Sequence, residues 1–154
     1  MSITAVKLRD QEALFSEAFE RPDLSLARRL YHPGVLYLSP TVRLYGWPRR
    51  IEGVEKTLEF IGLSIEHCPS IRYRAVESAC LPDGSSSFVR IHFDWDQGDE
   101  RLRSNYVVLY RYREGLIAQQ ELYYDPSGSI ERLPREANAA AERSRTGRGV
   151  LRAR

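Results

Sequence analysis

The stretch that decides the fold runs from Phe88 to Asp125 and reads FVRIHFDWD (88–96), QGDE (97–100), RLRSNYVVLYRYR (101–113), EG (114–115) and LIAQQELYYD (116–125). Polar and apolar residues alternate through its three long segments, and glycine-containing turns separate them. Alternation with a period of two is typical of half-buried strands, and short turns join antiparallel neighbours. We therefore expect three antiparallel strands here. The alternating segment IRYRAVESACL (71–81) predicts a fourth, joined to them by the turn PDGS (82–85).

The first half of the chain has helical rather than strand periodicity. Apolar residues recur at helical spacing over 10–20, 24–32 and 53–66, with Asp10 as a plausible N-cap of the first helix. A short strand is expected at 35–39, and an irregular arm with two prolines at 40–51. Helices followed by a strand meander indicate an α+β domain, with three N-terminal helices packed on one face of a curved antiparallel sheet.

Length and composition set the class of protein. The chain has 154 residues, enough for one domain with one core, and no apolar run long enough to span a membrane. The N-terminus lacks the pattern of a signal peptide, and the only cysteines, Cys68 and Cys80, lack the spacing of a zinc site or disulfide scaffold. We expect a cytoplasmic protein that neither holds a metal nor binds a membrane.

The positive formal charge comes from the C-terminus. The last twelve residues, 143–154, carry five arginines and no acid, and removing these five charges from +2 leaves −3 for residues 1–142. The body is therefore slightly acidic, and no nucleic-acid partner is expected. We predict a domain over residues 1–132 and a flexible basic tail over 133–154, whose removal from residue 143 onward leaves the melting temperature nearly unchanged.

One strand carries the candidate acid/base pair. His92 and Asp94 share a face of the segment 88–96, because side chains alternate along a strand, while Ile91 and Phe93 take the opposite face. If the polar face lines a pocket, His92 is a candidate proton carrier with Asp94 orienting it. If the apolar face points to the helices, both residues lie on the outer face, in solvent or at a dimer interface.

Other polar and aromatic residues are candidates for ligand contacts. Tyr106 on the next strand could stabilise an oxyanion, although aromatic residues in strands are also common core packing. Gln120 and Tyr124 share a face of the last strand, where an inward glutamine needs a partner from a ligand or a neighbouring strand. Trp47 in the irregular arm either covers the pocket mouth or packs on the third helix.

The element order resembles the nuclear transport factor 2-like superfamily, and within it the SnoaL-like group. The segments that carry the resemblance are LARRLYHPGVLYLSP (26–40), IEGVEKTLEFI (51–61) and YRYREGLIAQQELYYD (110–125). It implies a cone-shaped, cystatin-like α+β barrel. It also implies a small-molecule ligand and, in many members, a homodimer through the outer face of the sheet. The superfamily includes cyclases, isomerases, epoxide hydrolases, dehydratases and non-catalytic members, so the fold alone does not decide the activity.

The epoxide hydrolases of this superfamily allow a residue-level comparison. Tyr37 and Ser39 fall where those enzymes hold a water, and His92 with Asp94 is the nearest match to their arginine–aspartate pair. Leu122 occupies the position of their catalytic aspartate. The resemblance implies that SnoaL-type cyclases also rely on an acid in this last strand. The departure therefore argues against epoxide hydrolysis and against an aldol cyclase.

These observations predict a cofactor-independent isomerase, cyclase or dehydratase that moves a proton on a small, oxygenated, partly apolar metabolite of polyketide type. His92, Asp94 and Tyr106 are the expected catalytic residues, with Tyr37 as an alternative oxyanion donor. The expected substrate contacts are Tyr37, Ser39, Trp47, Gln120 and Tyr124. The alternative is a non-catalytic module that binds a small molecule or mediates dimerisation. The pocket distinguishes the enzyme from the non-catalytic module, because the enzyme requires His92 to line the pocket.

Overall fold

The computed structural model describes residues 2–125. Its elements are α1 (Ala5–Glu20), α2 (Leu24–Arg28), β1 (Tyr31–Leu38), the 3-10 helix η1 (Pro40–Tyr45), β2 (Arg50–Glu52), α3 (Val54–Glu66), β3 (Arg72–Cys80), β4 (Ser86–Gln97), β5 (Glu100–Arg113) and β6 (Leu116–Tyr124). The predicted tail over 133–154 lies outside the described residues, as does the end of the predicted domain. In the described part, no helix is long and apolar enough to cross a bilayer.

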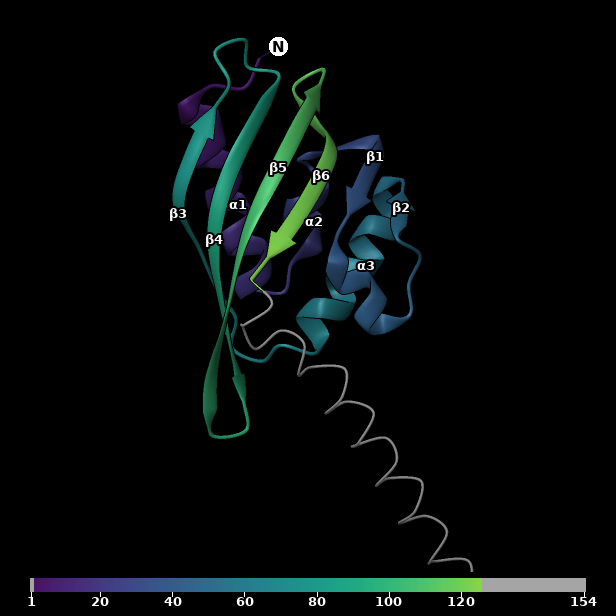
Figure 1. The fold of residues 1–154 in the computed structure, drawn as a ribbon, viewed down its shortest axis with the longest axis vertical. Coiled ribbons are helices and arrows are strands. Elements are labelled where there is room, and N and C mark those ends of the chain that lie inside the picture. Colours follow the sequence, from purple (N-terminus) through teal and green to yellow (C-terminus); the bar gives the residue numbers. More distant parts are fainter. Residues whose placement is uncertain (1, 126–154) are drawn as a thin grey trace, which may run out of the picture.

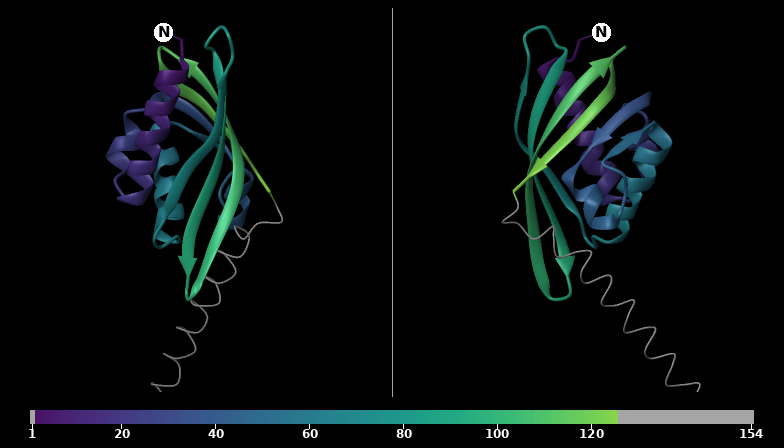
Figure 2. Two further views of the ribbon diagram at one scale, coloured as in Figure 1. Left: turned by 90° about the vertical axis from the view of Figure 1, so that its left-hand side faces the viewer. Right: turned by 45° about the vertical axis from the view of Figure 1, so that its right-hand side comes forward.

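The six strands form one curved sheet in the order β2-β1-β6-β5-β4-β3 (Figure 1). All neighbouring pairs are antiparallel except β1 with β6, which run parallel. The three helices lie together on one side of the sheet, as the turned views show (Figure 2). This confirms the predicted α+β cone, with helices on the concave face and a four-strand antiparallel meander behind them.

The two faces of β4 follow the alternation of its sequence. Val89, Ile91 and Trp95 are fully buried, whereas Arg90 is exposed on the opposite face. The β5–β6 turn uses Glu114 and Gly115, both with positive φ, at 54° and 78°. Two consecutive residues with positive φ form the tight hairpin turn that matches the twist of the strands.

The N-terminal boundaries differ from the sequence prediction. Helix α1 begins at Ala5 with Thr4 as its N-cap, where Asp10 was expected, because the Thr4 hydroxyl accepts a hydrogen bond from the backbone of Lys7 at 3.3 Å. The second helix ends at Arg28. Its expected last residues join β1, because Ile117 of β6 donates to the Leu30 carbonyl at 2.8 Å and Tyr31 pairs with Ile117.

The arm over 40–51 is more regular than expected. It holds η1 and the short strand β2, which pairs with β1 at the edge of the sheet. Ser39 caps η1, because its hydroxyl accepts from the backbone of Thr41 at 3.2 Å, and Gly46 ends it with a φ of 72°. Ser39 and Thr41 are thereby held in place where the chain leaves β1.

Candidate functional site

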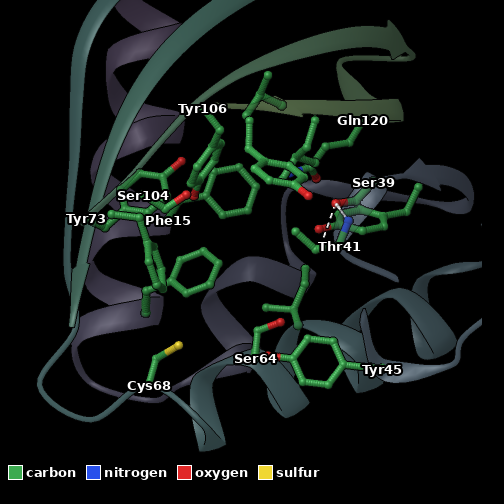
Figure 3. Close-up of a pocket in the computed structure, with 17 residues that line it drawn as sticks. Phe15, Ser39, Thr41, Tyr45, Ser64, Cys68, Tyr73, Ser104, Tyr106 and Gln120 are labelled. Atoms are coloured by element: carbon green, nitrogen blue, oxygen red, sulfur yellow. Dashed lines mark hydrogen bonds between the residues drawn. The ribbon is translucent and has the colours of Figure 1, made fainter. Parts of the chain in front are cut away.

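A cavity lies between the concave face of the sheet and the helices (Figure 3). Its volume is about 70 Å³. One water needs about 10–15 Å³ of such space, so the cavity has room for several waters or for a small organic molecule in their place. Its polar lining residues are Ser39, Thr41, Ser64, Cys68, Ser104 and Gln120. The other lining side chains are aromatic or aliphatic, and they include five tyrosines.

The cavity has two polar walls that face each other across it. Ser39, Thr41 and Gln120 lie on one side, and Tyr73, Ser104 and Tyr106 on the other (Figure 3). The first wall comes from the β1 end, η1 and β6, and the second from β3 and β5. An elongated ligand with an oxygen at each end would therefore meet hydrogen-bonding groups at both ends and apolar rings between them.

Hydrogen bonds within the protein hold the first wall. The hydroxyls of Ser39 and Thr41 lie 2.7 Å apart, and the Tyr31 hydroxyl donates to the Gln120 side-chain oxygen at 2.5 Å. The inward glutamine is therefore satisfied in part by the protein, one of the two alternatives from the sequence. Its orientation is fixed before any ligand arrives, which favours pre-organised recognition.

No charged side chain lines the cavity among residues 2–125. Burial raises the pKa of the Cys68 thiol to about 12 and that of the Tyr45 phenol to about 12. Burial also raises the pKa of Tyr37, Tyr73 and Tyr106 above the ordinary tyrosine value. These groups stay neutral at physiological pH, so the wall offers hydroxyl hydrogen bonds rather than ionic ones.

A carboxyl lies directly behind the wall. Glu12 of α1 has only 5% of its surface exposed, and its Oε2 accepts a hydrogen bond from the Tyr73 hydroxyl at 2.6 Å. Burial raises the pKa of Glu12, against the lowering effect of the neighbouring side chains of Tyr73, Tyr110 and Gln11. Glu12 does not itself line the cavity, but it contacts a residue that does.

The structure contradicts the geometry predicted for His92 and Asp94. Phe93 lines the cavity, Ile91 is fully buried on the same face of β4, and neither His92 nor Asp94 is among the lining residues. Asp94 instead accepts two hydrogen bonds from Arg103, at 2.7 and 3.0 Å. The Arg103 guanidinium is the main cause of the lowered pKa of Asp94. The apolar face packs on the helices because its burial stabilises the fold far more than burial of the polar face would.

The other predicted ligand contacts stay predictions, but the structure shows which of them line the cavity. Tyr37, Ser39, Tyr106, Gln120 and Tyr124 all line the one cavity. Trp47 does not. Its ring packs edge-on against Phe60 of α3, with centroids 5.4 Å apart, so the packing alternative holds and the lid assignment is wrong for the described structure.

Sequence reasoning missed Glu12, Cys68 and the small polar residues at positions 41, 64 and 104. A signal existed for Glu12, which shares a helical face with Phe15 and Phe19 at spacings of three and seven residues. An acid on an apolar helix face is unusual enough to mark. The small residues carry no such signal, because their position on the cavity wall depends on the curvature of the sheet.

We expect His92→Gln to leave ligand binding in the cavity unchanged. The side chain lies on the outer face beside Arg74 and Asn105, its partners on the neighbouring strands, and the sheet separates it from the cavity. Calorimetric titration of the variant with 3-ethylphenol, a small aromatic molecule used to probe the cavity, checks this. A tenfold loss of affinity, with the melting temperature unchanged, would restore a role for His92.

The fold and the cavity define an α+β cone protein whose cavity is lined mostly by aromatic and aliphatic side chains, with no charged one among the described residues. Sequence comparison matches residues 12–120 to the SnoaL-like domain family. The chain belongs to this family, whose fold is that of the nuclear transport factor 2-like superfamily. A search of curated protein sequences found no relative. In the part of the chain described, no group of three or more histidine, cysteine, aspartate or glutamate residues is placed to hold a metal ion.

Solved structures share the fold at low sequence identity. TsrD from Streptomyces laurentii superposes with a TM-score of 0.69 at 16% identity, covering 86% of this chain and 97% of its own. A hypothetical protein with a ketosteroid isomerase-like fold from Catenulispora acidiphila, in complex with trimethylamine, gives a TM-score of 0.65 at 11% identity, covering 77% of this chain and 88% of its own. A proposed SnoaL-like polyketide cyclase from Jannaschia gives 0.61 at 12% identity, covering 81% and 91%. These likenesses concern the fold.

Proposed function

We propose that the protein binds a small, uncharged, partly apolar molecule carrying oxygen atoms, and that the cone cavity is the binding site. The observation that carries this proposal is the cavity wall, which combines aromatic rings with hydroxyls and one amide and has no charged side chain among the described residues. Apolar pockets with a few convergent polar groups are typical of small-molecule sites. An ionic ligand would lose its hydration there and find no counter-charge.

A second candidate function is proton-transfer catalysis in the same cavity, as an isomerase, cyclase or dehydratase. One observation favours it: the carboxyl of Glu12 contacts the cavity residue Tyr73. The similarity to a proposed polyketide cyclase is consistent with it. The pair His92 and Asp94 no longer supports this function, because neither lines the cavity. Binding therefore stands first, and catalysis would depend on Glu12.

The test of binding uses two neighbouring positions on β6 with opposite faces. Leu122 lines the cavity, whereas Tyr123 is 60% exposed on the outer face. We expect Leu122→Trp to fill the cavity and weaken binding of 3-ethylphenol, a small aromatic probe with one hydroxyl, by about tenfold or more. The matched variant Tyr123→Trp should bind like the wild type.

Calorimetric titration measures both affinities, and melting curves show whether each variant is folded. Equal binding by the two folded variants would show that the probe sits elsewhere, and the cavity would lose its role. Equal losses in both variants would contradict the proposal as well, because only one of the two positions touches the cavity.

We also propose a homodimer through the outer face of the sheet, as predicted from the sequence. Phe88, Val107 and Tyr123 are 44%, 36% and 60% exposed, and register pairs Phe88 with Leu109 and Val107 with Tyr123 across the sheet. An apolar patch of this kind on a soluble protein favours an interface.

Light scattering at micromolar concentration checks the assembly. We expect the wild type to have the mass of a dimer and Val107→Glu that of a monomer, because a charge placed in an apolar interface loses hydration without gaining a partner. The control is Val6→Glu on α1, 57% exposed, which should remain dimeric. A monomeric wild type would end this proposal.

A further inference from the structure

Glu12 is the one carboxyl of the described chain with its side chain in the core behind the cavity. Its Oε2 accepts from the Tyr73 hydroxyl at 2.6 Å, and its Oε1 accepts from the Gln11 side chain at 3.4 Å. Tyr73 is 4% exposed, lines the cavity and stacks on Phe19, with ring centroids 5.2 Å apart. The carboxyl therefore meets the cavity through a single tyrosine held in place by packing.

The surroundings of Glu12 are phenolic. The groups that face it are Gln11 on its own helix, Tyr31 of β1, Tyr73 of β3, and Tyr106, Tyr110 and Tyr112 of β5. The Tyr110 hydroxyl lies close enough to Glu12 to lower its pKa, but it has no hydrogen-bond partner among the described residues. No described cation forms an ion pair with Glu12.

A buried acid without a cation lowers stability when it ionises, and a hydrophobic residue would fit the core without this cost. Acids kept in such places beside a cavity are candidates for a functional role. Glu12 is not only buried beside the cavity but also forms a direct hydrogen bond to a residue of the cavity wall.

We propose that Glu12 is a positioning residue, whose protonation state decides whether Tyr73 accepts or donates a hydrogen bond at the cavity wall. This inference rests on the proposed binding function and specifies the class of ligand. Oxygen acceptors such as ketones are preferred when Glu12 is protonated, and hydroxyl donors such as phenols when it is ionised.

The reason is the number of hydrogen-bond donors that Glu12 and Tyr73 have in each protonation state. An ionised Glu12 only accepts, so the Tyr73 proton points at it and the cavity meets the lone pairs of the phenol. A protonated Glu12 donates its own proton to the Tyr73 oxygen, and the Tyr73 proton is then free to point at a ligand oxygen. No bond other than hydrogen bonds changes in this exchange, and the proton comes from solvent.

The test compares two small aromatic probes across pH. Acetophenone only accepts hydrogen bonds, whereas the hydroxyl of 3-ethylphenol donates one. Between about pH 4.5 and pH 8.5, where free carboxyls ionise and phenols stay neutral, we expect acetophenone to bind more weakly with rising pH and 3-ethylphenol more tightly. The ratio of their dissociation constants should change by about tenfold, because the two probes respond in opposite directions and each gains or loses one hydrogen bond to the neutral Tyr73 phenol.

Two variants and one spectrum identify the group responsible. Glu12→Gln keeps the shape of the side chain but cannot titrate, so the ratio should become independent of pH. Tyr73→Phe removes the hydroxyl that Glu12 orients, so it should also abolish the pH dependence of the ratio. Carbon-13 NMR of the Glu12 carboxyl should show a titration with the same midpoint as the ratio in the wild type, and this measurement does not depend on either variant folding.

The outcomes separate the two proposals. If both probes bind in the cavity with parallel pH profiles, or if the ratio still changes in Glu12→Gln, the role of Glu12 is wrong while the binding function stands. If neither probe binds the wild type at any pH, the binding function fails, and the inference that rests on it fails too.

Discussion

Replacing Phe15 by alanine should lower the free energy of unfolding by about 3–5 kcal/mol, the usual cost of removing a buried phenylalanine. The side chain is 1% exposed, and its ring contacts four other aromatic rings, those of Phe19, Tyr31, Tyr73 and Tyr110. It also lines the cavity, so the substitution should enlarge the cavity at the same time. Urea unfolding measures the loss of stability.

The control lies on the same helix. Val6→Ala removes an apolar side chain that is 57% exposed, and it should change the free energy of unfolding by less than about 0.5 kcal/mol. A loss below about 1 kcal/mol for Phe15→Ala would mean that α1 does not pack against the sheet as the structure shows.

The second large effect is a pH-dependent gain of stability in Glu12→Gln. The pKa of Glu12 is raised in the folded protein, chiefly by burial. The folded state therefore holds this proton more tightly than the unfolded state does. Its contribution to stability is complete below the unfolded pKa and is lost as the pH rises through the folded pKa.

Glutamine cannot lose a proton, so Glu12→Gln escapes this loss. The difference in unfolding free energy between variant and wild type should move in favour of the variant from about pH 4.5 upward, by about 1.4 kcal/mol for each pH unit by which folding raises the pKa, and then level off. Urea unfolding at several pH values checks this, since all other groups cancel in the difference. A difference that is constant with pH would show that the Glu12 pKa is ordinary.

The sequence predicted those elements of the fold that depend on local sequence patterns, and it failed where an element depends on a contact between distant residues. The alternation from Val89 to Trp95 and the turn at Glu114 and Gly115 are local patterns, and the meander follows them closely. The start of β1 could not be found this way. Tyr31 joins a strand because Ile117, far along the chain, pairs with it, and this long-range contact overrides the helical pattern of the segment.

The candidate site shows the same limit. Alternation predicted which residues of each strand share a face with Tyr106 and with Gln120. Both of these residues line the cavity. Alternation alone left open which face of β4 points inward. The histidine and the aspartate attracted the catalytic assignment, but the burial of Ile91 and Phe93 decided the orientation and left Asp94 to pair with Arg103 on the outer face.

The most direct test of the binding site is a crystal structure of the protein soaked with 4-bromophenol, with the bromine located by its anomalous scattering. The proposed function predicts one strong bromine peak inside the cavity, and a phenol oxygen within hydrogen-bond distance of Gln120 or one of the tyrosine hydroxyls on the wall. Bromine peaks only on the outer surface, with the cavity unchanged at saturating probe, would contradict it.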